Sequence, residues 1–410
     1  MIPPPSKKLT NLPPYLFVRL SALKEKAAAS GLKVIDMGMG NPDQPSPTHV
    51  VEEAARSVRE EPWTHRYPQT KGIPELRSAI ADWYRRRFQV SLDPTNEVIP
   101  LVGSKEGLAH LMFAYLGPGD VALVPSPCYP VHYNGVLLAG AKVHWLPLKE
   151  ENRFLPDLKK IPAAVARRAK VLILNYPNNP TGAVLENTEL LQEAVRFAKK
   201  HRCFVLYDNA YSEISFDGYR APSFLELPDA KKVGVEFHSF SKTYSMAGWR
   251  LAWACGNAEI IGHLAKFKSF LDYGVPGFLQ KAAVAALNGP QNYVVQAAQL
   301  YRRRRDVLCE ALKQIGWSVE KPKASMYVWA RLPERFRKTG SLAFCEKLIL
   351  NTGVVVAPGV GFGPYGEGYV RFALIVGDSE IREAVTQIGN FLNQKASKPS
   401  SPSSKLLMSA

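Results

Sequence analysis

The segment whose residue types could do the most chemistry spans residues 238–250, HSFSKTYSMAGWR. Lys242 follows an apolar run that is typical of a buried strand. Because burial disfavours the charged form of a lysine, its pKa would fall, and the amine could act as a nucleophile or form a Schiff base. A lone lysine at a strand end more often extends to water. The nearby Ser239, Ser241 and Arg250 change that balance, because hydroxyls and a fixed guanidinium predict a phosphate cradle.

A second string, NYPNNPTG, occupies residues 175–182. Pro177, Pro180 and Gly182 predict a tight loop after the apolar run VLILN. Asn179 precedes a proline and is therefore biased away from helix, so its amide could be held at a fixed angle toward a ligand. An ordinary Asn-Pro turn is the alternative, but this string is more specific than a turn requires.

A third segment, CFVLYDNAY, places Asp208 at the end of an apolar strand, where open α/β sheets bind ligands. A buried acid there needs a cationic partner or a proton donor, and a protonated pyridine nitrogen would serve. Tyr211 could donate a phenolic hydrogen bond beside it. For Asp208 taken alone, a helix N-cap is the favoured interpretation.

Two further positions could bind anions. Ser104 and Lys105 lie between an apolar run and a helical stretch, where backbone N–H groups and a hydroxyl make an anion site. Arg371 lies within the apolar string YVRF and is costly to bury without an anion, so a carboxylate partner would justify it. An edge-strand arginine that points to solvent is an equal alternative.

Other patterns exclude functions. Residues 361–366 match GxGxxG but contain Pro364 and lead into a strand, so the dinucleotide-binding interpretation is rejected. The five cysteines are widely spaced without a CxxC, and the eight histidines form no HExxH, so we expect reduced thiols and no metal site.

The elements that must position these residues follow from the hydrophobic pattern. Between residues 98 and 256, short apolar runs alternate with helical stretches, which indicates βα units and a largely parallel, buried sheet. Residues 291–315 predict one long charged helix, and the strands and helices beyond it indicate an α+β unit. We therefore expect four parts: an N-terminal arm with part of a small domain (1–44), a large domain (45–290), a small C-terminal domain (291–394) and a disordered tail (395–410).

The composition limits the class of protein. The chain has 410 residues, 46% of them hydrophobic, and a formal net charge of +16. We find neither an apolar run near the ~18 residues of a membrane helix nor a secretory signal, so we expect a cytoplasmic protein. The arginines at 302–305 would point all round a helix, which favours a solvated surface over a nucleic-acid patch.

Taken together, these segments resemble the class I and II aminotransferases, the pyridoxal 5′-phosphate enzymes of the aspartate aminotransferase fold. The resemblance covers residues 15–394 and is carried by SFSKTYSMAGWR, NNPTG and DNAY. LPPYLF, IDMGMGNPD, GSKEGLAHL, KSFLDYG and PKASMYVWA resemble the alanine-type glutamate–pyruvate and LL-diaminopimelate branches. The implied fold is α/β, fold type I, with a mostly parallel seven-stranded sheet between helices and a smaller α+β domain.

The resemblance also implies roles at the cofactor. Lys242 would bind pyridoxal phosphate covalently and move the substrate proton, and Asp208 would pair with the pyridine nitrogen. Tyr211 and Asn179 would hydrogen-bond the ring oxygen, and Tyr129 would stack on the ring. The phosphate would be held by Ser104, Lys105, Ser239, Ser241 and Arg250.

Substrate and partner roles are implied in the same way. Arg371 would take the α-carboxylate, helped by Asn179 and the Gly40 backbone. Tyr67 would reach the phosphate site of a neighbouring subunit, which implies a homodimer. Tyr129 stands where the aspartate branch has a tryptophan, and we can assign no second arginine to a distal carboxylate, which argues against strict aspartate specificity.

The function we expect is amino transfer between an alanine-type amino acid and a 2-oxo acid, with glutamate/2-oxoglutarate or pyruvate as partner. LL-diaminopimelate aminotransfer in lysine biosynthesis and an aspartate-type or broad specificity are alternatives. A C–S β-lyase shares fold and cofactor and would release ammonia and pyruvate instead of a new amino acid. The expected partners are small molecules, not nucleic acid or membrane.

Overall fold

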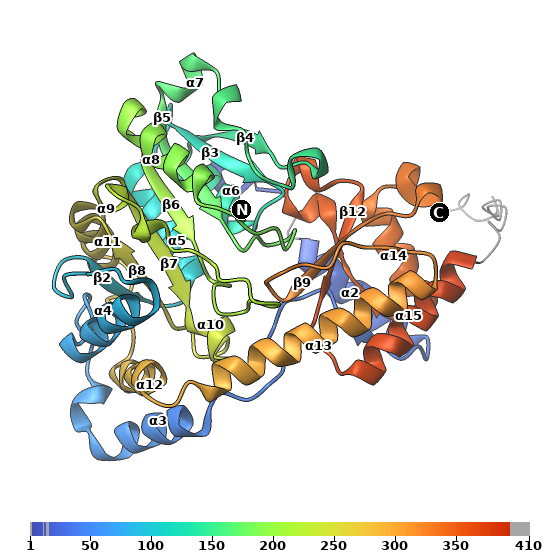
Figure 1. The fold of residues 1–410 in the computed structure, drawn as a ribbon, viewed down its shortest axis with the longest axis horizontal. Coiled ribbons are helices and arrows are strands. Elements are labelled where there is room, and N and C mark those ends of the chain that lie inside the picture. The colour runs from blue at the N-terminus through green and yellow to red at the C-terminus, as the bar shows by residue number, and fades with distance from the viewer. Residues whose placement is uncertain (1, 11, 14–15, 394–410) are drawn as a thin grey trace.

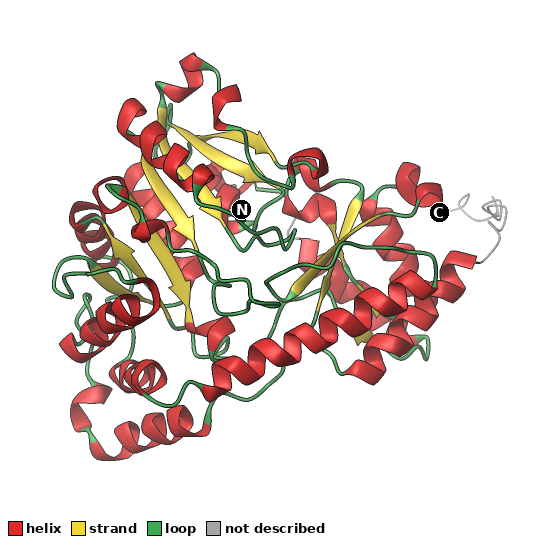
Figure 2. Ribbon diagram, in the orientation of Figure 1, coloured by secondary structure: helices red, strands yellow, loops and turns green. Residues whose placement is uncertain are grey.

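The central feature is a seven-stranded sheet with strand order β2-β8-β7-β6-β5-β3-β4. The computed structural model describes residues 2–10, 12–13 and 16–393, and these form two groups of strands (Figures 1 and 2). In the larger group β8 is antiparallel to both neighbours and the other pairs are parallel. Its strands are β2 (Val98–Leu101), β3 (Val121–Ser126), β4 (Lys142–Pro147), β5 (Ala169–Asn175), β6 (Phe204–Asp208), β7 (Gly234–Ser239) and β8 (Ala252–Gly256).

The sheet is buried on both faces, which explains the continuous apolar runs of its strands. Along β5, Val171 and Ile173 pack into one hydrophobic core, and Leu172 and Leu174 pack into the core on the opposite face. One face is covered by α5 (Ser104–Tyr115), α6 (Val131–Leu138) and α11 (Ala258–Ser269). The other is covered by α4 (Pro74–Phe88), α8 (Glu189–His201) and α12 (Gly277–Asn288). The predicted mostly parallel seven-stranded sheet between helices is confirmed.

The second group of strands forms an antiparallel sheet of order β11-β12-β9 and a parallel pair, β1 with β10. These strands are β1 (Ile35–Asp36), β9 (Tyr327–Arg331), β10 (Val354–Val355), β11 (Ala357–Pro358) and β12 (Tyr369–Ala373). They pack with α2 (Leu16–Ala29), α13 (Asn292–Gln314), α14 (Ser341–Thr352) and α15 (Asp378–Asn393). The smaller α+β unit is therefore present, and the N-terminal segment joins it through β1.

Figure 1 shows how the two groups are connected. The long helix α13 starts near α12 of the larger group and passes beside the smaller sheet. The N-terminal chain returns through α3 (Thr48–Glu60), which packs on α12. Short helices complete the chain: α1 (Lys7–Thr10), α7 (Ala163–Ala166), α9 (Ala230–Val233), α10 (Phe240–Thr243) and the 3₁₀ turns Pro62–His65, Glu150–Asn152, Leu158–Lys160, Phe224–Glu226, Glu334–Thr339, Gly359–Phe362 and Pro364–Gly366. The exact domain boundaries stay predictions, and the predicted tail lies outside the described residues.

The surface interpretation of the arginines at 302–305 is wrong for two of them. Arg304 donates to both carboxylate oxygens of Asp43, at 2.7 Å each, and Arg305 donates to Asp217 at 2.6 Å. Both side chains are buried. Four consecutive residues do point all round a helix, but one side of α13 faces the protein interior, so two of the four need acidic partners.

Among the described residues, no helix combines the length and the apolar character that a membrane span requires.

Candidate active site

A cavity lies between the carboxyl ends of the large parallel sheet and the smaller sheet. It collects every predicted site residue except Tyr67: Gly40, Ser104, Lys105, Tyr129, Asn179, Asp208, Tyr211, Ser239, Ser241, Lys242, Arg250 and Arg371. Ligands bind at this edge in open α/β sheets because the loops that follow the strands converge there.

Lys242 enters the cavity from α10, directly after β7. The Ser239 hydroxyl caps this short helix by accepting from the Ser241 N–H at 3.2 Å. The Lys242 ammonium donates to the backbone oxygen of Gly40 at 2.6 Å. Burial lowers the pKa of Lys242; the Tyr327 hydroxyl opposes this, and the positive charge of Arg371 adds to it. The amine is therefore shifted toward the neutral form that a nucleophile or a base needs.

Asp208 ends β6 and is only 4% exposed. Its Oδ2 lies 3.0 Å from His132 Nε2, whereas its Oδ1 has no hydrogen-bond partner within the described chain. An unsatisfied buried carboxylate oxygen is costly, and a cationic N–H on a bound ligand would remove that cost. Asp208 therefore offers one oxygen to the cavity and keeps the other fixed by α6. The helix that the N-cap interpretation requires does not begin here.

The loop after β5 ties these groups together through two asparagines. Asn175 donates from Nδ2 to the backbone oxygen of Asp208 at 2.7 Å, and its Oδ1 accepts from the Asn179 N–H at 2.9 Å. The Asn179 amide nitrogen in turn lies 3.3 Å from the Tyr211 hydroxyl oxygen. The loop therefore fixes the backbone of Asp208 and the side-chain hydroxyl of Tyr211.

Arg371 is buried at 3% exposure, so the interpretation as a solvent-facing edge residue is wrong. It donates to Asn179 Oδ1 at 2.8 Å and to the Gly38 backbone oxygen at 2.7 Å. Its guanidinium lies over the rings of Tyr327, at 4.0 Å, and Phe362, at 4.6 Å. No carboxylate in the described part of the chain forms an ion pair with it, so a carboxylate ligand would supply the missing anion.

The opposite end of the cavity is an anion site. Ser104 and Lys105 begin α5, and the N–H groups of a helix's first turn point out of its N-terminus, where they favour an anion. Arg250 faces them: a Cβ at Gly103, whose φ is +79°, would overlap its guanidinium. With the Ser239 and Ser241 hydroxyls, this end offers two cations and several donors, which suits a phosphate.

Three residues of the cavity environment were not singled out from the sequence. Tyr327 and Asn175 line the cavity, and His132 supports Asp208. Asn175 begins the NYPNNPTG string and Tyr327 lies within PKASMYVWA, so both stood in segments that the sequence marks, whereas His132 lies in no such string. Tyr129 lines the cavity with its ring perpendicular to His132, whereas Tyr67 lies outside, 87% exposed, with its ring 5.3 Å from Tyr273.

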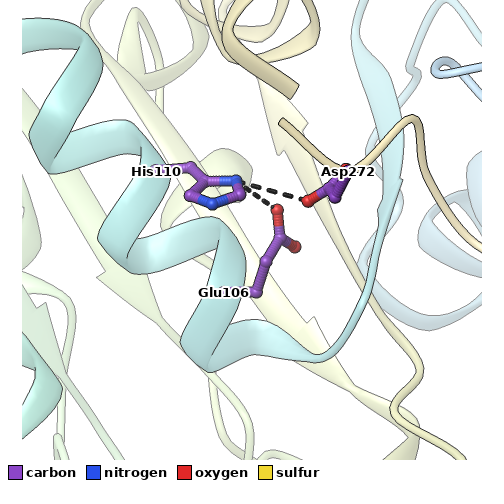
Figure 3. Close-up of side chains that lie close together, drawn as sticks. All are labelled: Glu106, His110 and Asp272. Carbon is purple, nitrogen blue, oxygen red and sulfur yellow. Dashed lines mark ion pairs between the residues drawn. The ribbon is translucent and has the colours of Figure 1, made fainter. Parts of the chain in front are cut away.

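Figure 3 shows a cluster of Glu106, His110 and Asp272, and Glu106 directly follows Lys105 of the anion site on α5. His110 Nδ1 lies 2.5 Å from a Glu106 oxygen and 3.6 Å from Asp272. The fully buried Lys268 ammonium lies between the two acids, 2.8 Å from Glu106 and 3.0 Å from Asp272. Since Lys268 already supplies a cation, the cluster is an ion-pair network. Glu106 also accepts from the Val102 N–H at 3.1 Å and so anchors the start of α5.

Comparisons with known proteins agree with this arrangement. The family model "Aminotransferase class I and II" matches residues 33–388. The LL-diaminopimelate aminotransferase of Dehalococcoides mccartyi is 50% identical over 95% of this chain and 99% of its own, and that of Moorella thermoacetica is 46% identical over 95% and 98%. The substrate-bound BacF structure from Bacillus subtilis aligns with a TM-score of 0.91 at 39% identity, covering 95% of this chain and 98% of that one.

Proposed function

The chain belongs to the class I and II aminotransferases, and within this family we propose that it uses pyridoxal phosphate to transfer the amino group of LL-diaminopimelate to a 2-oxo acid. The observation that carries the choice of donor is the identity of 50% to an LL-diaminopimelate aminotransferase over nearly the whole length of both chains. The alanine-type specificity that we expected first has less support than this alternative.

The cavity suits pyridoxal phosphate at three separate points. The unsatisfied Oδ1 of Asp208 would pair with the protonated ring nitrogen. The lowered pKa of Lys242 favours covalent attachment at the cofactor's aldehyde. At the anion site, Lys105 and Arg250 would hold the phosphate with the hydroxyls of Ser104, Ser239 and Ser241. Tyr129 would stack on the ring, and Tyr211 and Asn179 would hold its oxygen.

The bound cofactor would supply an electron sink. The chain's own residues would do the rest. Arg371, with Asn179 and the backbone near Gly40, would hold the substrate α-carboxylate and so fix the orientation of the α-carbon. Lys242, released from the cofactor when the substrate amine takes its place, would take the proton from that carbon and return it to the cofactor's former aldehyde carbon, as a positioned base of lowered pKa. Asp208 would keep the ring nitrogen protonated by its negative charge.

We also propose that the active unit is a homodimer. Tyr67 does not line its own cavity, its ring packs on Tyr273, and Phe270, Leu271 and Tyr273 are 82%, 59% and 54% exposed. Such an exposed apolar group is typical of a protein interface. Across it, Tyr67 would reach the phosphate site of the neighbouring subunit.

Subunit mixing tests this role of Tyr67. A Lys242→Ala chain and a Tyr67→Ala chain are co-expressed, since a mixed dimer would contain one site with both native residues. We expect about a quarter of the sites to be native in a statistical mixture, and hence activity above either variant alone when Tyr67→Ala keeps less than about a third of native activity. Activity no greater than the better single variant would contradict the arrangement.

The donor is tested by incubating the cofactor-loaded protein with 2-oxoglutarate and LL-diaminopimelate, L-alanine or L-aspartate, and measuring glutamate. We expect kcat/KM for LL-diaminopimelate to be at least about tenfold higher than for the others. A preference for alanine would return the assignment to the alanine branch. Release of ammonia and pyruvate from a β-thioether amino acid, without glutamate, would establish the lyase instead.

A further inference from the structure

Tyr327 contacts both Arg371, at the proposed carboxylate site, and Tyr211, at the proposed cofactor site. It lies on β9, where it is register partner to Ala373, and it is only 2% exposed. Arg371 stands two residues from Ala373 on the neighbouring strand, so the pair is diagonal on one face of the sheet. The ring lies 4.0 Å from the Arg371 guanidinium, and the hydroxyl lies 3.1 Å from that of Tyr211.

Either hydroxyl of this pair could be the donor. Asn179 Oδ1 accepts from Arg371, so its Nδ2 is the group that faces the Tyr211 oxygen. A phenolic oxygen can accept two hydrogen bonds and donate one. If Tyr327 donates the second bond, the proton of Tyr211 is left to point into the cavity.

We propose that Tyr327 is a positioning residue that holds the Arg371 guanidinium with its ring and directs the Tyr211 proton toward the cofactor's ring oxygen with its hydroxyl. This inference rests on the proposed function, because it assumes a bound cofactor and a substrate carboxylate. One side chain would then align the substrate site with the cofactor site.

The charges around Tyr327 agree with its role as donor. Burial raises the pKa of Tyr327, but the positive charges of Arg371 and Lys242, together with the hydrogen bond to Tyr211, bring it below its ordinary value. Burial raises the pKa of Tyr211, and the nearby Tyr327 and Asp208 raise it further, although Arg371 opposes them. The more acidic phenol is the better donor, which agrees with a hydrogen bond from Tyr327 to Tyr211.

The position of Tyr327 is fixed by a close backbone approach. A Cβ at Gly40 would overlap the Tyr327 hydroxyl, so the backbone can pass there only as glycine. The Gly40 carbonyl is also the acceptor for the Lys242 ammonium. The phenol is thereby held against the segment that faces Lys242.

Two substitutions separate the ring from the hydroxyl. Tyr327→Phe keeps the ring over Arg371 and removes the donor, whereas Tyr327→Leu removes both. Each cofactor-loaded variant is titrated with pH by visible absorbance, and with propionate, which offers a carboxylate without an amino group. Tyr369→Phe on β12 is the matched control, because its hydroxyl bonds to Glu150 at the surface.

A hydrogen bond from Tyr211 to the cofactor's ring oxygen lowers that oxygen's affinity for a proton. If Tyr211 became a weaker donor, the midpoint of the absorbance titration would therefore move to higher pH. We expect Tyr327→Phe to raise it by about half a pH unit and to keep propionate binding within about twofold. We expect Tyr327→Leu to weaken propionate binding about tenfold, and the control to change neither quantity.

An unchanged midpoint in Tyr327→Phe, or unchanged propionate binding in Tyr327→Leu, would overturn the inference while the native holoprotein still supports the proposed function. Failure of the native chain to bind pyridoxal phosphate would instead overturn both.

Discussion

Arg371 donates a 2.8 Å hydrogen bond to the side-chain oxygen of Asn179, although 192 positions separate them in the sequence. Arg371 belongs to the smaller sheet, and Asn179 lies in the loop after β5 of the larger one. The proposed carboxylate site therefore exists only when the two groups of strands are packed together. The affinity of this site for a carboxylate therefore depends on how the two groups of strands are placed relative to each other.

Removing the guanidinium tests this site. Arg371→Ala should raise KM for the amino acid and the 2-oxo acid alike, by about 100-fold, because the buried charged contact to the carboxylate is lost. Arg371→Lys should recover only part of the loss, since lysine cannot reproduce the bidentate contact. Steady-state kinetics with both substrates measure the effect, with the half-exposed Arg331→Ala as control. An unchanged KM would remove Arg371 from the site.

Asp208→Asn tests the charge beside the ring nitrogen. The amide preserves the shape of the side chain and a contact with His132 but removes the negative charge, so we expect kcat to fall by about 100-fold or more. Cofactor content is measured alongside kcat to separate binding from chemistry. Asp82→Asn on the exposed face of α4 is the control. Full activity in Asp208→Asn would rule out the proposed pairing.

The ion-pair network beside the anion site should matter for stability. Lys268→Met leaves Glu106 and Asp272 without their cation, and breaking a buried pair from one side costs about 3–5 kcal/mol. Urea unfolding measures the change in the free energy of unfolding. Lys266→Met, exposed on the same helix, should cost less than about 0.5 kcal/mol. Equal stabilities of the two variants would mean that the network contributes nothing.

The same ion-pair network predicts that the free energy of unfolding depends on pH. Burial alone would raise the pKa of Glu106, but the His110 hydrogen bond and the Lys268 charge lower it from 4.5 to about 2. A carboxyl whose pKa is lower in the folded state stabilises the fold above its unfolded pKa, and this contribution disappears as the pH falls toward the folded value. The native protein should therefore lose more stability than Glu106→Gln between about pH 5 and pH 3. Asp272, whose pKa is raised by burial and by Glu106, contributes with the opposite sign in the native protein. Parallel curves in urea titrations would contradict the prediction.

Much of the fold and the cavity could be predicted because the information is local. β5 and the loop after it are adjacent in the sequence, so strand, turn and Asn179 are read together, and the same holds for β7 and Lys242. Apolar runs buried on both faces also distinguish a parallel sheet from a half-exposed one.

The features of the fold and the site that could not be predicted depend on contacts between segments that are distant in the sequence. Arg304 is buried because Asp43, from the N-terminal segment, reaches α13, and no local pattern announces that pair. Tyr327 stands in an apolar strand like any core tyrosine, and only the neighbouring strand reveals Arg371 beside it. His132 has no motif around it, and its role follows from its distance to Asp208.

Trapping of the covalent bond tests most directly whether Lys242 binds pyridoxal phosphate in this cavity. The cofactor-loaded protein is treated with borohydride, digested, and the modified peptide identified by mass spectrometry. We expect one phosphopyridoxyl group, on the peptide that contains Lys242, and its loss in Lys242→Ala. A modification on a different lysine, or covalent trapping that persists in Lys242→Ala, would contradict it.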